Sequence, residues 1–118
     1  MNRRFIGSTV TALIDRPIGS HHPKYEDLVY PINYGYIPGT LSPDGEELDC
    51  YILGVYEPKN EYTGVCIAVI HRLNDDDDKL IIAPRGARFT KSEIEDAVSF
   101  QERYFDHEVF FHSEPSEK

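Results

Sequence analysis

Four carboxylates lie within six consecutive positions of one segment, and side chains this close together could bind cations. They are Asp44, Glu46, Glu47 and Asp49, and Gly45 marks a turn beside the first of them. Carboxylates this close repel one another unless cations lie among them. Hard divalent cations prefer oxygen ligands of this kind, so the segment favours a site for Mg²⁺, or for Mn²⁺, over a zinc site.

A second acidic run, residues 75–78, consists of four aspartates and is followed by Lys79. The simplest interpretation of this run is a solvated turn, and Asp44 could likewise only cap its own turn. Two acidic turns at strand ends can also meet at one mouth of a barrel. Together with lysines and tyrosines, such carboxylates and their metal ions are what phosphoryl transfer to water requires.

Short apolar runs separated by turn residues predict a chain built mainly of strands. Residues 90–93 (Thr-Lys-Ser-Glu) have the form of a capping box, and apolar residues then repeat at helical spacing. Together these patterns predict a mainly β (α+β) fold, in which a small barrel carries one late helix against its side. The expected strands are 9–14, 49–55, 64–73, 79–83 and 107–112.

Length and charge limit the classes of function. The 118 residues predict a single domain over residues 1–112 with a polar tail at 113–118, and the net charge of −9 argues against nucleic acid or an anionic membrane as partner. Cys50 and Cys66 lie in apolar runs without C-x-x-C spacing, and no signal peptide or membrane span is apparent. We therefore expect buried free thiols and a cytoplasmic location.

The segment from about Thr9 to Tyr104 resembles the soluble family I inorganic pyrophosphatases, as a short and divergent member. Three motif pairs in the family's order carry the resemblance: IDRP (14–17) with KYE (24–26), YPINYGYI (30–37) with DGEELD (44–49), and DDKL (77–80) with AP (83–84). The second pair is the most specific. The resemblance implies an OB-like five-stranded β-barrel with helices packed outside it and Mg²⁺-dependent hydrolysis of inorganic pyrophosphate to two phosphates.

The resemblance also assigns roles by position. It implies metal ligands at Asp44, Asp49 and Asp77, with Asp49 bridging two metals, a further ligand at Asn74 or Asp75, and support of the metals by Glu26. It implies phosphate contacts from Lys24, Lys79 and Tyr104, with Tyr34 beside the reacting phosphate. Either Glu46, at the position of the water-activating residue, or Asp49 would take the proton of the attacking water.

Three departures from the family pattern affect this assignment. Glu46 replaces an aspartate and is one methylene longer. Only three residues separate Glu26 from Tyr30, so the longer hairpin that supplies a phosphate-binding arginine is missing, and Phe105 replaces a phosphate-binding lysine. Losing one such charge-stabilising donor typically costs about 10²–10³ in rate. We therefore expect compensation from arginines near the predicted site, with Arg85, Arg88 and Arg103 as candidates.

Two alternatives to pyrophosphate hydrolysis stay open at the level of sequence. The shortened hairpin could admit a larger phosphoanhydride, such as a nucleotide or polyphosphate. A barrel that keeps metal or phosphate binding but has lost turnover would instead act as a binding module. The resemblance is also compatible with a homo-oligomer.

Overall fold

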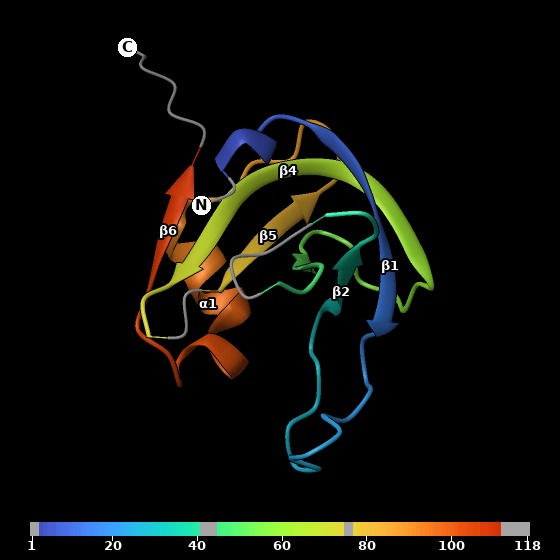
Figure 1. Cartoon of the computed structure of the whole chain (residues 1–118). Helices are drawn as coiled ribbons and strands as arrows, with labels where there is room; N and C mark the ends of the chain where they lie inside the picture. Colours follow the sequence, from blue (N-terminus) through green and yellow to red (C-terminus); the bar gives the residue numbers. More distant parts are fainter. Residues whose placement is uncertain (1–2, 41–44, 75–76, 112–118) are drawn as a thin grey trace.

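Six strands, one α-helix and one short 3₁₀ helix form the part of the chain that the computed structural model describes, residues 3–40, 45–74 and 77–111. Figure 1 shows their arrangement, with the helix on one side of the barrel. In chain order the elements are η1 (Arg3–Phe5), β1 (Thr9–Arg16), β2 (Asn33–Ile37), β3 (Leu48–Ile52), β4 (Glu61–Arg72), β5 (Asp78–Ala83), α1 (Lys91–Glu102) and β6 (His107–Phe111).

Five of the strands close into a barrel. The strands are neighbours in the order β1-β2-β3-β5-β4, and a further pairing of β1 with β4 closes the ring. All these pairs are antiparallel except β3 with β5, which are parallel. The prediction of an OB-like five-stranded barrel with a helix outside it is therefore confirmed.

The sequence predicts five strands, but two of the expected assignments differ from the five strands that form the barrel. The segment 33–37 forms β2, although its pattern predicted no strand. The expected last strand exists as β6, but it pairs only with residues 68–72 of β4 and lies outside the ring. Strand β4 is long enough to pair with β1 through residues 61–65 and with β6 through residues 68–72.

Gly35 accounts both for the absence of a strand pattern in residues 33–37 and for the close packing of β2 on β1. A Cβ atom at Gly35 would overlap the backbone oxygen of Leu13 on β1, so only glycine lets the two strands approach this closely. Glycine and the proline at position 31 read as turn signals in a sequence, whereas here Gly35 pairs with Ile14 and Cys50 inside the sheet. The glycine marks a close approach between strands.

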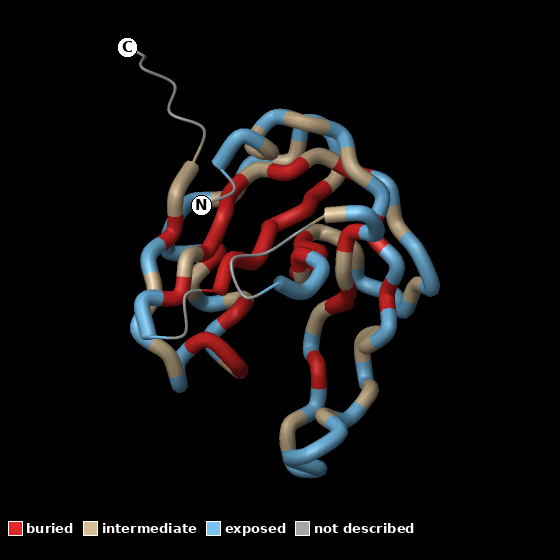
Figure 2. Tube along the Cα trace, viewed as in Figure 1, coloured by how far each residue is buried: buried red, intermediate tan, exposed pale blue. Residues whose placement is uncertain are grey.

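The two faces of the strands bury two separate clusters, as the alternation of side chains requires. Figure 2 shows the buried residues concentrated along the central strands. The interior cluster contains Ala12, Ile14, Ile37, Leu48, Cys50, Ile52, Cys66, Val69, Leu80 and Ile82. The outer cluster, which lies between barrel and helix, contains Tyr30, Tyr34, Tyr51, Leu53, Ala68, Ile70, Ile81, Ile94, Val98 and Val109.

Helix α1 begins at the predicted capping box. The Thr90 hydroxyl accepts a hydrogen bond from the Glu93 backbone N–H at 3.1 Å, and the Glu93 carboxylate accepts one from the Thr90 N–H at 2.8 Å. Ile94 and Val98 then pack against the barrel. The capping prediction is confirmed.

Both cysteines are buried and free, as predicted. Burial, the largest cause, raises the pKa of the Cys66 thiol to about 12, so the thiol stays protonated. No helix among the described residues is both long and apolar enough to cross a membrane.

Candidate active site

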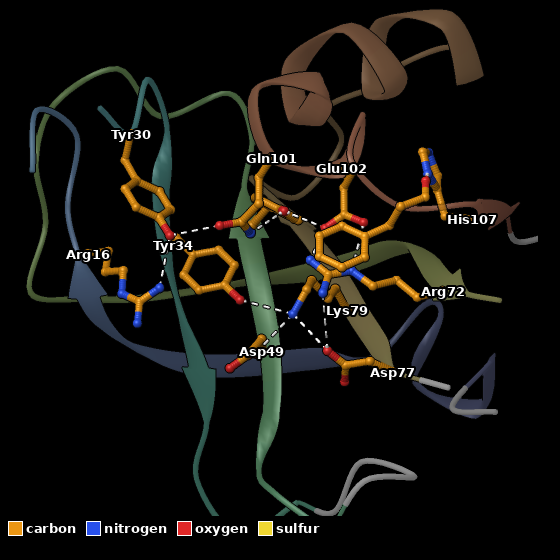
Figure 3. A network of polar contacts seen from close by, with 12 residues as sticks. Arg16, Tyr30, Tyr34, Asp49, Arg72, Asp77, Lys79, Gln101, Glu102 and His107 are labelled. Atoms are coloured by element: carbon orange, nitrogen blue, oxygen red, sulfur yellow. Dashed lines mark hydrogen bonds and ion pairs between the residues drawn. The ribbon is translucent and has the colours of Figure 1, made fainter. Parts of the chain in front are cut away.

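Lys79 is the centre of a cluster of polar side chains on the outer face of the barrel (Figure 3). Its position follows from the register, which sets Lys79 on β5 beside Asp49 on β3. The Lys79 ammonium donates hydrogen bonds to Tyr34 Oη at 3.0 Å, to Asp49 Oδ2 at 3.0 Å and to Asp77 Oδ2 at 2.9 Å. Only 2% of the lysine is exposed, so the three partners replace its hydration.

The charges of this cluster follow from its surroundings. Burial alone would lower the pKa of Lys79 and is the largest cause, but Tyr34, Asp49 and Asp77 together outweigh it, so the pKa is raised. Burial raises the pKa of Tyr34, which keeps its phenol neutral. The cluster therefore holds a permanent ammonium ion beside a neutral hydroxyl.

A second set of polar contacts joins the barrel to helix α1. Arg72 on β4 forms a bidentate pair with Glu102, with its Nε at 3.0 Å from Oε1 and its Nη2 at 2.7 Å from Oε2. The Tyr51 hydroxyl donates to Glu102 Oε2 at 2.6 Å and accepts from Gln101 Nε2 at 2.7 Å. The Tyr30 hydroxyl in turn donates to Gln101 Oε1 at 2.8 Å. These contacts fix the end of the helix against the strands.

A cavity of about 780 Å³ lies between this end of helix α1 and the loop of residues 17–32. Four cationic side chains line it, which is a high local concentration in a chain of net charge −9. A cavity with such a lining favours an anionic ligand. Its lining residues are Arg16, His22, Tyr25, Asp27, Leu28, Tyr34, Arg72, Lys79, Gln101, Arg103, Tyr104 and Phe105.

The structure brings together about half of the predicted site residues. Asp49 and Asp77 contact Lys79, and Tyr34, Lys79 and Tyr104 line the cavity.

The other predicted residues lie elsewhere. Lys24 and Glu26 are exposed in the loop of residues 17–32 and are not among the lining residues. Glu46 is exposed in the turn before β3. Asp44 and Asp75 fall outside the described residues.

Two predicted metal ligands converge on one cation. Asp49 Oδ2 and Asp77 Oδ2 both lie within 3.0 Å of the Lys79 ammonium. Within the described ranges no group of three or more His, Cys, Asp or Glu residues is arranged to hold a metal ion. Converging carboxylate oxygens nevertheless fit the donor set of a hard divalent cation.

Of the three arginines expected to compensate, one lines the cavity and two lie elsewhere. Arg103 lines it, whereas Arg85 contacts Thr9 Oγ1 at 3.3 Å and Arg88 lines a different cavity. The cavity contains two arginines that the sequence did not single out, Arg16 and Arg72. A lone arginine in a strand has no local pattern that reveals it, although Arg16 does stand inside the IDRP motif.

Fold and cavity together define a class of protein, an OB-like barrel with a cavity on its outer face that is lined by cationic side chains. Comparison with protein families narrows this class. The model of the inorganic pyrophosphatase family matches residues 15–114, and the chain therefore belongs to that family.

Relatives and solved structures agree with the family. The chain is 40% identical over 65 residues to an inorganic pyrophosphatase of Saccharolobus solfataricus and 34% identical over 65 residues to that of Aeropyrum pernix. These alignments cover 52% of this chain in each case but only 38% and 37% of the two relatives. The fold resembles that of an inorganic pyrophosphatase from Neisseria gonorrhoeae, with a TM-score of 0.65 at 22% identity over 83% of this chain and 74% of the other.

Proposed function

We propose that the protein hydrolyses inorganic pyrophosphate to two phosphates with the help of a divalent cation, Mg²⁺ or Mn²⁺. The observation that carries this proposal is the buried Lys79 ammonium, held by Tyr34, Asp49 and Asp77 at the wall of a cationic cavity. Membership of the inorganic pyrophosphatase family supports it.

Lys79 and the helix end bind and orient the substrate in this proposal. The Lys79 ammonium is fixed by three partners that use its three N–H groups, so it attracts phosphate oxygens through its charge, and it donates to one of them when a present partner is released. Arg103 and Tyr104, which directly follow helix α1, line the cavity from the helix side. Arg103 Nη2 donates a hydrogen bond to Tyr104 Oη at 3.2 Å. Lys24 is a further phosphate ligand only if the loop of residues 17–32 moves toward the cavity.

The carboxylates are proposed to hold the metal and to handle the proton. Asp49 and Asp77 would be ligands, with Asp44, Asp75 and Glu26 as further candidates from the family pattern. A divalent cation bound there supplies charge neutralisation for the phosphates. Asp49 is 37% exposed at its side chain, so it is accessible to the attacking water and can accept its proton. Glu46, which is exposed three residues earlier, is the alternative base.

The test is phosphate release from pyrophosphate with Mg²⁺, with EDTA, and in an Asp49→Asn variant. We expect EDTA to abolish release and Asp49→Asn to lower kcat by about 10²–10⁴-fold. Asp96→Asn makes the same chemical change at an exposed position of helix α1 and should stay active. Release that survives EDTA or Asp49→Asn contradicts a metal-dependent enzyme, and metal-dependent phosphate binding without release indicates a binding module.

The size of the cavity favours a second candidate, a larger phosphoanhydride. Small-molecule pockets of about 300–1,000 Å³ accommodate ligands much larger than two phosphates, and this one has about 780 Å³. Exposed Tyr25 and Tyr104 at the cavity could stack on a base. Nucleoside triphosphates and tripolyphosphate in the same assay distinguish the two substrates, because a larger substrate predicts a higher kcat/KM than that for pyrophosphate.

A further inference from the structure

Arg16 enters the cavity because of an irregularity in β1. With strict alternation, Arg16 would point to the barrel interior together with Ala12 and Ile14, which are both buried there. The pairing of β1 with β2 shifts register between Ile14 and Arg16, so that Ile14 pairs with Gly35 and Arg16 with Tyr34. One extra residue is thus inserted, and such a bulge redirects the following side chain to the other face.

Two tyrosines hold the guanidinium group after this change of direction. Arg16 Nη1 donates to Tyr30 Oη at 2.9 Å. Its guanidinium carbon lies 5.7 Å from the centre of the Tyr30 ring and 5.6 Å from that of Tyr34. Figure 3 shows the side chain pointing to these two rings. The hydrogen bond uses one of the five N–H groups of the arginine, so donors remain for a ligand.

Arg16 differs from the other two strand cations of the cavity in its charge balance. Lys79 is paired with Asp49 and Asp77, and Arg72 is paired with Glu102. No carboxylate of the described residues forms an ion pair with Arg16, whose partners are two phenols. No direct ion pair therefore neutralises the Arg16 charge, which lies on the other side of the Tyr34 ring from the carboxylate cluster (Figure 3).

The loop opposite Arg16 supplies no cation to the cavity. Residues 17–32, which form the opposite wall, contain no arginine, and their one lysine does not line the cavity. A phosphate group near Lys79 leaves its partner phosphate in need of a further cation, and on the β1 side of the cavity Arg16 is placed to supply one. A planar guanidinium can bind two phosphate oxygens at once.

We propose that Arg16, aimed by the β-bulge, is a substrate-binding residue that holds the phosphate group remote from the carboxylate cluster. The proposal rests on the proposed function, since it assigns a subsite of the same cavity. According to this proposal, Tyr34 separates two phosphate subsites. The subsite at Lys79 would be assisted by the metal, and the subsite at Arg16 would bind its phosphate without a metal.

The test compares Arg16→Gln and Arg16→Lys with the wild-type protein. Glutamine keeps a donor for Tyr30 and loses the charge, so we expect KM for pyrophosphate to rise about 10–100-fold, with a smaller change in kcat. Inorganic phosphate, titrated by calorimetry, should bind more weakly by a similar factor. Lysine keeps the charge but not the planar fork and should raise KM by a smaller factor.

Arg85→Gln is the matched control, because Arg85 contacts Thr9 and does not line the cavity, and it should leave KM and phosphate binding unchanged. A folded Arg16→Gln protein with wild-type KM and phosphate affinity overturns the proposal. Should Arg16→Gln fail to fold, an unchanged KM in Arg16→Lys overturns it equally.

The phosphate titration separates this proposal from the proposed function. A wild-type protein that releases no phosphate from pyrophosphate refutes the function, whereas phosphate binding that depends on Arg16 still supports the subsite. Full turnover in Arg16→Gln with unchanged KM refutes the subsite alone.

Discussion

The barrel interior and the layer between barrel and helix α1 are buried by the same strands, but their side chains differ in kind. The interior cluster consists of aliphatic residues and two cysteines. The outer layer combines apolar residues with buried Arg72, Lys79, Gln101 and Glu102. Adjacent residues of β5 show the contrast, since Leu80 and Ile82 face the interior while Lys79 and Ile81 face the helix side. One strand thus serves stability with one face and the site with the other.

Breaking the Arg72–Glu102 pair should be the most destabilising change. Arg72→Met leaves the buried Glu102 without its cationic partner, and loss of such a partner typically costs about 3–5 kcal/mol of unfolding free energy. Urea unfolding followed by circular dichroism measures this. The double variant Arg72→Met with Glu102→Gln removes both charges and should recover part of the loss. If the double variant is as unstable as the single one, the unpaired charge of Glu102 is not the cause of the lost stability.

A cavity in the interior should affect stability without affecting the site. Ile82→Ala removes a fully buried side chain from the interior cluster and should cost about 2–5 kcal/mol. The kinetic constants per folded molecule should not change. Ile81→Ala is the control from the other face, because Ile81 is the neighbour of Tyr51 on β3 and its loss should also alter KM or kcat. Equal kinetic effects of the two variants would contradict the division between the faces.

The smallest expected effect is a pH dependence at the edge of the outer layer. Burial opposes charging of His107, but its hydrogen bonds to Glu95 at 2.7 Å and to the Phe105 carbonyl at 2.9 Å outweigh this and raise its pKa above 6.5. A raised pKa in the folded state contributes stability that is complete below about pH 6.5 and disappears as pH rises through the folded-state value.

His107→Gln should therefore reduce the unfolding free energy more at about pH 5.5 than at about pH 9. Urea unfolding of both proteins at the two pH values measures this difference. Glu95→Gln is a control that removes the charged partner and should reduce the pH dependence in the same way. A pH-independent difference would show that the pair with Glu95 does not stabilise the charged ring.

Sequence predicted most of the fold because strands β4 and β5 and the capped helix have strong local patterns. It did not predict β2, whose glycine is required by a strand that is distant in sequence. Within the site, the positions of Asp49, Lys79 and Tyr34 followed from family motifs. Arg16 could not be found in this way, because a register shift against β2 decides which face it joins, and alternation alone assigns it to the interior.

Closure of the barrel also has a consequence for how the chain folds. The closing pair joins Thr9 to Val65, and the parallel pair joins Asp49 to Lys79. Such long-range pairing slows folding, since chain entropy is lost before the contacts form. During synthesis, β1 must wait for β4, and the ring cannot be completed until residue 83 has emerged. Strand β1 can pair early with β2, but its second partner β4 comes much later in the chain, so Arg16, Asp49 and Lys79 first come together at a late stage of folding.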